Sequence, residues 1–338
     1  MKDKLKLKTN LPILILVSVI TCYLVVKDSV HDVNGIISSC NLSFLFLAFL
    51  SVMLGDLFKS FSIYIIAKDN ETNLSFKESY SLQLETNFFN GVTPFALGGQ
   101  PFQLYILKHK NKIPYLKGTN IIFCDYYSFQ IVLLFWVLIL FILNCIFNFI
   151  KLNAVMNTFL LIGFIVHIVV FIVLEYATRS KHNKTAIKLI HLLSKAHIVK
   201  DEEKTKTNAV KRLNELKKLI NEFKKDRSLL IRSVIYNSLK LLFHSLSIYF
   251  VFLSIGININ PITAVLVGVY VWVMSSFIPI PGATGGMEYS FITLFETMLT
   301  SGIVASGVIL WRFITYYFMV IVGAIIFVIV NKKIKKTR

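Results

Sequence analysis

The sequence has few charged residues and few cysteines. Charged residues make up 16% of its 338 residues, whereas soluble globular domains contain about 25%, so a water-facing surface would lack polar cover. The four cysteines, Cys22, Cys40, Cys124 and Cys145, are scattered and form no CxxC pair, which argues against a disulfide or zinc framework. The sequence also lacks HExxH, GxSxG and P-loop motifs, so it offers no signature of a metalloprotease, a serine hydrolase or a nucleotide-driven machine.

Long apolar runs, by contrast, fill the sequence. Hydrophobic residues make up 55% of it, and its mean hydropathy is +0.68. A helix needs about 20 apolar residues to cross a bilayer, and the chain therefore predicts an all-α polytopic membrane protein with about eight transmembrane helices. No small-residue cleavage site follows the first run, so we expect an anchor there rather than a cleaved signal peptide. The candidate spans are 10–26, 43–67, 119–146, 154–175, 229–254, 261–279, 287–300 and 303–330.

The segment 80–108 is less apolar than these spans and is interrupted by Pro and Gly. Non-helical backbone at membrane depth is stable only where protein or a wet cavity satisfies its polar groups, so we expect a re-entrant hairpin here. We expect a single integral membrane domain over residues 1–338, with a first half at 10–175 and a second half at 229–330. A cytoplasmic loop at 176–228 separates the two halves.

Basic residues are distributed unevenly along the chain, whose net charge is +18. Of the 36 Lys and Arg residues, only Lys27 and Lys151 fall in the loops expected on one side of the membrane. The N-terminal segment, the loops of the other side and the C-terminal segment hold almost all the others. Because cytoplasmic loops retain Lys and Arg, we expect both termini to be cytoplasmic and the protein to lie in the plasma membrane.

The loop 176–228 is the largest expected part outside the membrane. Between residues 179 and 227 it holds fifteen Lys and Arg against six Asp and Glu. We expect an amphipathic helix whose lysines face anionic lipid headgroups, or a solvated helical hairpin that simply follows the positive-inside rule. Aromatic residues do not alternate with the basic ones, so we expect no nucleic-acid binding. Apolar residues recur there at helical spacing: Val210, Leu213, Leu216, Ile220 and Phe223.

Two segments, 93–101 and 279–288, repeat one pattern in the two halves of the chain. Both contain Pro-x-x-x-Gly-Gly, and Pro stops a helix while Gly-Gly permits tight turns. We expect each segment to break a helix within the membrane, so that the following half-helix presents its N–H groups to an anion. Paired breaks in two halves are typical of a transporter's substrate site, although they can also be structural kinks.

Ionisable residues within the apolar spans are costly in lipid and should face a cavity or each other. Asp56 and Lys59 are three residues apart on one helix, and we expect them to form a structural ion pair. Lys240 and His244 share one face of their span, where we expect a snorkelling or packed polar contact. We expect His167 to be a packed histidine.

The two broken segments resemble the membrane region of lysylphosphatidylglycerol synthase, the flippase-like part of the multiple peptide resistance factor. The family's Thr-Pro, Gly-Gly, Glu-Pro motif is similar to residues 93–101, and its Pro-x-Pro-Gly, Gly-Gly, Glu motif is similar to 279–288. A family arginine, followed by a glycine, corresponds to Arg312 and Gly323. The similarity covers about residues 10 to 330.

Two residues in the first segment depart from the family pattern. Gln100 stands where the family usually has Glu, and Gln103 where it usually has Arg. Both departures remove a charge. The resemblance and the ionisable residues together give these expected substrate-binding residues: Thr93, Pro94, Gly98, Gly99, Gln100, Gln103, Asp125, Pro281, Gly282, Gly285, Gly286, Glu288 and Arg312.

The resemblance implies a membrane lipid translocase that handles a phospholipid, with aminoacylated lipids such as lysylphosphatidylglycerol among the candidates. An enzyme is the alternative: a membrane-bound lysyltransferase or glycosyltransferase component, with Asp125, Glu288 and His244 as the groups that could serve it. We expect no counterpart of the resistance factor's soluble lysine-transferring domain in this sequence, because the loop 176–228 is too short. A separate soluble transferase is then a possible partner, as is a second copy of the chain. A scaffold that docks partners on its basic loop is a third possibility, and we expect no cofactor.

Overall fold

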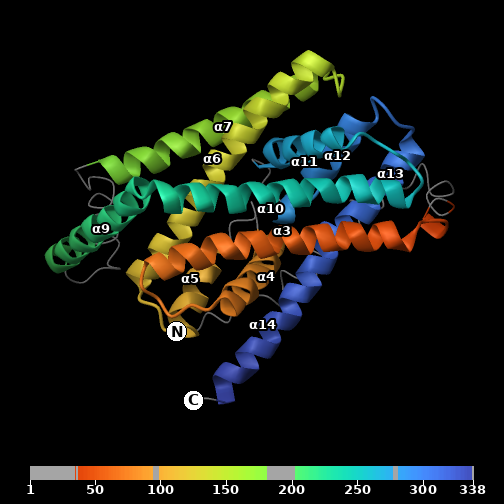
Figure 1. Cartoon of the computed structure of the whole chain (residues 1–338). Helices are drawn as coiled ribbons and strands as arrows, with labels where there is room; N and C mark the ends of the chain where they lie inside the picture. The colour runs from red at the N-terminus through yellow and green to blue at the C-terminus, as the bar shows by residue number, and fades with distance from the viewer. Residues whose placement is uncertain (1–34, 36, 94–98, 181–201, 277–280, 337–338) are drawn as a thin grey trace.

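The computed structural model describes residues 35, 37–93, 99–180, 202–276 and 281–336, and these residues form helices and no strand (Figure 1). The long helices are α3 (Leu42–Asp69), α6 (Tyr115–Phe147), α7 (Ala154–Arg179), α10 (Arg227–Ser254) and the continuous run of α13 (Ser301–Arg312), η3 (Phe313–Tyr317) and α14 (Phe318–Lys336). The shorter ones are α4 (Phe76–Val92), α5 (Gly99–His109), α9 (Glu202–Lys225), α11 (Pro261–Ser275), η2 (Pro281–Ala283) and α12 (Gly286–Phe295).

Five of the described helical runs are long and apolar enough to cross a membrane. They are α3, α6, α7, α10 and the run through α13, η3 and α14, with 26 to 33 residues each. A crossing needs about 20, so the predicted spans in these segments are confirmed as helices of membrane length. The predicted span 10–26 lies outside the described residues. The helices α11 and α12 have only 15 and 10 residues, so eight crossings and a re-entrant 80–108 remain predictions.

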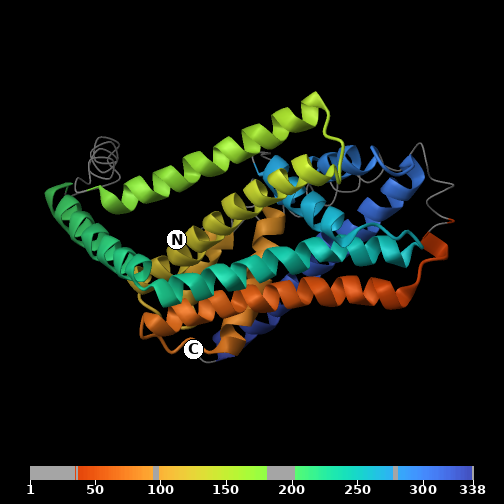
Figure 2. The same cartoon turned by 45° about the horizontal axis from the view of Figure 1, so that its top comes forward.

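The helices α3 and α10 lie side by side and antiparallel along nearly their whole length (Figures 1 and 2). A glycine permits this close approach, since a Cβ on Gly55 would lie only 2.7 Å from Cδ2 of His244. Hydrogen bonds also join the pair: Ser51 Oγ donates to the Phe243 carbonyl at 2.7 Å, and the Asn41 N–H donates to the Ser254 carbonyl at 2.6 Å. The α3–α10 pair packs against α6, while α14 packs against α4.

The helix α9 is amphipathic, and its apolar side packs against the bundle. Ile220 and Phe223 are each 2% exposed, while basic residues such as Lys211 and Lys218 stay exposed. At its end, Lys224 Nζ donates to Glu175 Oε1 of α7 at 2.8 Å. The predicted amphipathic helix therefore begins at Glu202, before the first residue of its apolar repeat, Val210. It ends in an ion pair with α7.

One turn of the last long helix is wider than the rest. Between α13 and α14, η3 is a π-helical turn in which the N–H of Phe318 donates to the carbonyl of Phe313, five residues earlier. Single π-helical turns inside α-helices often occur at functional sites. This turn follows Arg312 directly and contains Tyr316, and both residues belong to the site described next.

The outside of the bundle is apolar and much of its inside is polar. Large apolar side chains on α6 and α7 are exposed, for example Phe135, Leu138, Leu161 and Val169 at 52–58%. Such continuous apolar surface is unusual on soluble proteins and suits contact with lipid tails. Charged residues lie buried in the interior instead: Asp56, Asp125, Lys240, Glu288 and Arg312 are at most 7% exposed.

Candidate functional site

A cavity of about 410 Å³ lies inside the bundle. This volume falls in the range of about 300–1,000 Å³ that is usual for small-molecule sites. Both broken segments contribute to its wall: Gln100 comes from the first, and Gly282, Ala283 and Met287 come from the second. The helices around the segments add Asn90 and Gly91 of α4, Gln103 of α5 and Arg312 of α13.

Tyr316 contacts the second broken segment and the helix end that leads into the first. Its hydroxyl donates to the Gly91 carbonyl at 3.0 Å, at the end of α4. Its ring lies against Gly282, where a Cβ would come within 2.3 Å of Cε2. Gly282 has φ +62°, a left-handed conformation that glycine adopts without strain. The end of α4, which leads into the first segment, therefore lies near the second segment, although the two are far apart in the sequence.

A buried ion pair dominates the second broken segment. Arg312 Nε donates to Glu288 Oε1 at 2.7 Å, and both residues are 3% exposed. The other carboxylate oxygen of Glu288 accepts from the Gly285 N–H at 2.7 Å. Gly285 (φ +85°) turns the chain into α12, which begins at Gly286.

Glu288 shares the start of α12 with the predicted anion site. The half-helix was predicted to offer its N–H groups to a substrate anion, and the Glu288 carboxylate already accepts from one of them, the N–H of Gly285. A carboxylate in the first turn satisfies an N–H group and interacts favourably with the helix dipole. Arg312 makes longer contacts through its other nitrogens, at 3.5 Å to the Gly282 carbonyl and 3.4 Å to Thr284 Oγ1. Pro281 is the first residue of η2, which leads into this turn.

The first broken segment uses neutral groups instead. The N–H of Gly99, at the start of α5, donates to Asn90 Oδ1 at 2.9 Å. Thr93 Oγ1 donates to the Phe89 carbonyl at 2.7 Å and so closes the end of α4. Gln100 and Gln103 line the cavity, and Gln103 is 5% exposed. The predicted site residues Pro94 and Gly98 lie outside the described residues.

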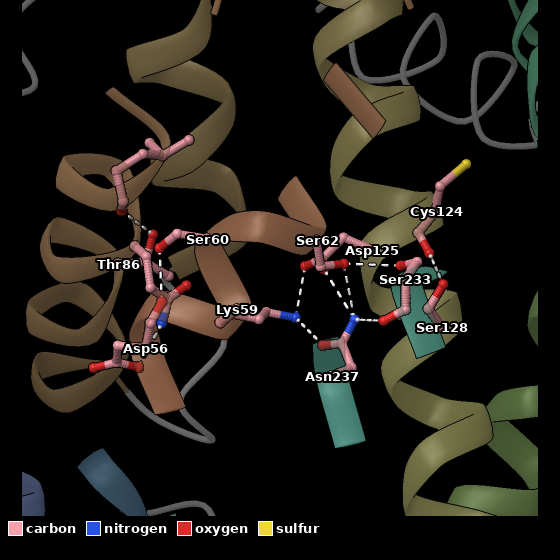
Figure 3. A network of polar contacts seen from close by, with 12 residues as sticks. Asp56, Lys59, Ser60, Ser62, Thr86, Cys124, Asp125, Ser128, Ser233 and Asn237 are labelled. Atoms are coloured by element: carbon pink, nitrogen blue, oxygen red, sulfur yellow. Dashed lines mark hydrogen bonds and ion pairs between the residues drawn. The ribbon is translucent and has the colours of Figure 1, made fainter. Parts of the chain in front are cut away.

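Asp125 lies on the cavity wall, but in a different ion pair from the one expected. Its Oδ2 is 2.7 Å from Lys59 Nζ, and its Oδ1 accepts from Ser62 Oγ at 2.7 Å (Figure 3). Lys59 also donates to Asn237 Oδ1 at 2.8 Å. A polar network of α3, α6 and α10 thus holds this pair inside the bundle.

The predicted ion pair between Asp56 and Lys59 is therefore wrong. The two side chains leave α3 in different directions (Figure 3), and packing brings a carboxylate of α6 within reach of Lys59. Asp56 is completely buried and accepts from Asn87 Nδ2 at 2.7 Å. It also lies 3.5 Å from His244 Nε2.

Lys240 and His244, for which the sequence predicted a snorkelling or packed polar contact, line the cavity. Lys240 is 7% exposed, and its Nζ lies 4.6 Å from the ring centre of Trp272. The predicted packed histidine, His167, is also on the cavity wall, where its Nδ1 pairs with Gln130 Oε1 at 2.9 Å. The signal for Lys240 was in the sequence, because an ionisable residue within a span is by default a candidate for function.

Several buried polar atoms at the cavity have no hydrogen-bond partner among the described residues. Buried polar groups are nearly always paired, so each exception calls for an explanation. A polar ligand or water in the cavity would satisfy these atoms. They are Gln100 Oε1, His167 Nε2, Ser245 Oγ and Trp311 Nε1.

The comparisons with known proteins agree with the architecture. The model of the lysylphosphatidylglycerol synthase TM region matches residues 12–323, a range that includes both broken segments and the whole cavity wall. No curated protein matches the chain. With five membrane-length helical runs in the described residues, the protein is a multi-pass membrane protein. The match extends over most of the sequence, and the chain therefore belongs to the lysylphosphatidylglycerol synthase transmembrane region family.

Proposed function

We propose that this protein is a lipid translocase that carries the headgroup of a phospholipid through the bundle, with aminoacylated lipids such as lysylphosphatidylglycerol among its substrates. One observation supports the proposal: residues of both broken segments border one cavity, lined by charged and amide side chains among apolar ones, inside a bundle of membrane-length helices. A charged headgroup is costly in hydrocarbon, and the charged and amide side chains of the cavity would lower that cost. The acyl tails would stay in the bilayer.

The charged lining suits both ends of such a headgroup. Arg312 supplies a cation for the phosphate; only its Nε makes a short contact with Glu288, while its other nitrogens have contacts of 3.3–3.5 Å. Contacts of that length are weak and can be exchanged for phosphate oxygens. Glu288 and Asp125 supply carboxylates for an ammonium group.

The family and the charge distribution support the remaining features of the proposal. The protein would lie in the plasma membrane with both termini in the cytoplasm, and the hairpin of α4 and α5 would enter the bilayer without crossing it. A separate soluble transferase would supply any aminoacylated lipid, and copies of the chain could associate. The family description supports a role in lipid chemistry, and transport is the step that a cavity between broken segments serves best.

A flipping assay tests the proposal. Purified protein is reconstituted in liposomes with fluorescent phosphatidylglycerol or lysylphosphatidylglycerol, and dithionite reports the lipid that reaches the outer leaflet. We expect wild type to flip lipid and both Glu288→Ala and Arg312→Ala to be at least tenfold slower. Glu296→Ala is the matched control, because Glu296 ends the same helix in an exposed position.

Equal flipping by wild type and both variants would contradict the assigned roles, and no flipping by wild type would contradict the function. Adding lysyl-tRNA to the same liposomes distinguishes a lysyltransferase from a translocase. Formation of lysylphosphatidylglycerol by the purified chain would identify a transferase instead.

A further inference from the structure

The basic residues within the membrane spans differ in how they are neutralised. Lys59 and Arg312 each contact a carboxylate at 2.7 Å, and Arg232 is exposed on α10. Lys240 is buried, yet no hydrogen bond or ion pair joins its ammonium to the residues that the structure describes. It is thus an unpaired buried cation at the cavity.

Two aromatic rings form the immediate surroundings of Lys240. Its Nζ lies 4.6 Å from the ring centre of Trp272 and 5.7 Å from that of Phe129. Aromatic faces attract a cation, but they do not satisfy the three N–H donors of an ammonium group. All three residues line the cavity, so an acceptor inside it can reach the ammonium.

Asp56 does not take that place. Its Oδ2 accepts from Asn87 Nδ2 at 2.7 Å, and its Oδ1 accepts from Gln83 Nε2 at 3.3 Å, with His244 Nε2 at 3.5 Å. Asp56 balances the charge of Lys240 from a longer range, without accepting a hydrogen bond from it. The ammonium therefore lacks a direct acceptor, although the charge of the region is balanced.

Other donors at the cavity wall also lack partners. Ser245 Oγ and Trp311 Nε1 are buried and make no hydrogen bond within the described residues, and both residues line the cavity. An indole N–H can only donate, and a hydroxyl can donate as well as accept. A ligand that brings several acceptor oxygens and a negative charge would satisfy these donors together with Lys240.

We propose that Lys240 is an anion-binding residue of the cavity and that it takes the phosphate of a phospholipid headgroup. The inference rests on the proposed function and deepens it. The phosphate contacts Lys240, whose charge has no direct partner, and the terminal nitrogens of Arg312, whose Nε keeps its ion pair with Glu288. The aromatic faces of Trp272 and Phe129 hold the ammonium in place when no lipid is bound.

Binding to the purified full chain tests the role of Lys240. Tryptophan fluorescence follows binding, because Trp272 and Trp311 line the cavity. The probes are dihexanoylphosphatidylglycerol, the phosphate-free dihexanoylglycerol, and inorganic phosphate. We expect Lys240→Met to weaken phosphatidylglycerol binding at least tenfold, Lys240→Arg to weaken it less, and neither to change dihexanoylglycerol binding. Arg232→Met is the matched control on the exposed side of the same helix, and it should bind like wild type.

A measurement on the wild-type protein covers the case in which a variant does not fold. Reductive methylation modifies accessible lysines, and mass spectrometry of the peptides reports the extent at Lys240. Phosphatidylglycerol should protect Lys240 at least fivefold, while dihexanoylglycerol should not. Equal labelling with both lipids, or unchanged affinity in folded Lys240→Met, would overturn the proposal.

The source of the phosphate and the transport function are tested separately. If inorganic phosphate protects Lys240 as well as the lipid does, the assignment to a lipid headgroup is wrong. If wild type fails to flip lipid but Lys240→Met still loses phosphatidylglycerol binding, the translocase proposal fails and the binding residue stands. If wild type flips lipid and Lys240→Met binds and flips normally, only the role of Lys240 fails.

Discussion

The two broken segments share the sequence pattern Pro-x-x-x-Gly-Gly, but the first has neutral side chains at its helix start and the second has a charged pair. In the first, the neutral side chain of Asn90 caps the half-helix at Gly99, and Gln100 and Gln103 face the cavity. In the second, Glu288 caps the half-helix and is itself paired with Arg312. In both segments a helix begins at the second glycine of the pattern, whereas the charge at the cavity depends on the residues that follow.

The comparison also predicts how each segment responds to substitution. A buried ion pair is hard to remove one partner at a time, because the remaining charge is left uncompensated. Removing a neutral cap or an unpartnered amide should lower the free energy of unfolding by less. Substitutions in the second segment should therefore lower the stability of the protein more than substitutions in the first.

Removing one member of the ion pair should have the largest effect on stability. Arg312→Met leaves Glu288 as a buried, unpaired carboxylate, which typically costs about 3–5 kcal/mol. We expect a clear fall in the Tm of the purified protein in detergent. The double variant Glu288→Met/Arg312→Met should be more stable than Arg312→Met alone; a double variant that is less stable than the single one would show that the pair does not act as a unit.

Gly282→Ala should be the next most damaging change. The new Cβ would lie 2.3 Å from Tyr316 Cε2, and the residue has φ +62°. A left-handed conformation alone costs a non-glycine residue about 1–2 kcal/mol, and the clash adds to this. Gly285→Ala is the control, because its φ is +85° but no atom lies within 4 Å of the new Cβ. Equal Tm values for the two variants would contradict the contact with Tyr316.

Asn90→Ala should have a moderate effect, since it removes the cap of α5 without leaving a charge. Loss of an N-cap typically costs about 1 kcal/mol. Asn90→Asp should retain the hydrogen bond to Gly99 and a Tm near that of wild type. Hydrogen exchange at the first residues of α5 would locate the effect, and unchanged protection there in Asn90→Ala would argue against the cap.

Gln100→Met should have the smallest effect. Gln100 Oε1 has no partner among the described residues, so its loss should change stability by less than about 0.5 kcal/mol. We expect the Tm to stay constant while the affinity for phospholipid changes. A large fall in Tm would show that Gln100 is structural and would remove the contrast between the two segments.

The sequence predicted the spans well because each depends on local composition. The predicted span 119–146 lies within α6 (Tyr115–Phe147), and 154–175 lies within α7 (Ala154–Arg179). The broken segments were also visible, because Pro and Gly act on the chain locally. The partners of the charged residues were not predictable in the same way. Lys59 pairs with Asp125 of α6 rather than with Asp56 of its own helix, a choice that depends on packing.

Lys240 shows the same limit for the candidate site. The sequence places it one turn before His244 on a single helix face, but only the packing of α10 against α6 and α11 puts it beside Phe129 and Trp272. The neighbours of its ammonium are two aromatic rings from helices far away in the sequence, and neither ring carries a hydrogen-bond acceptor like a carboxylate. No local pattern carries that information.

The π-helical turn at Phe313–Tyr317 has a consequence for the evolution of the site. Such a turn accommodates one residue more than an α-helical turn. Deleting one residue there would restore an ordinary helix and rotate α14 by about 100° relative to α13. Tyr316 would then leave Gly91 and Gly282, even though no charged residue had been touched. Among homologues, the number of residues in this turn should consequently be conserved more strictly than the identity of the apolar residues around it.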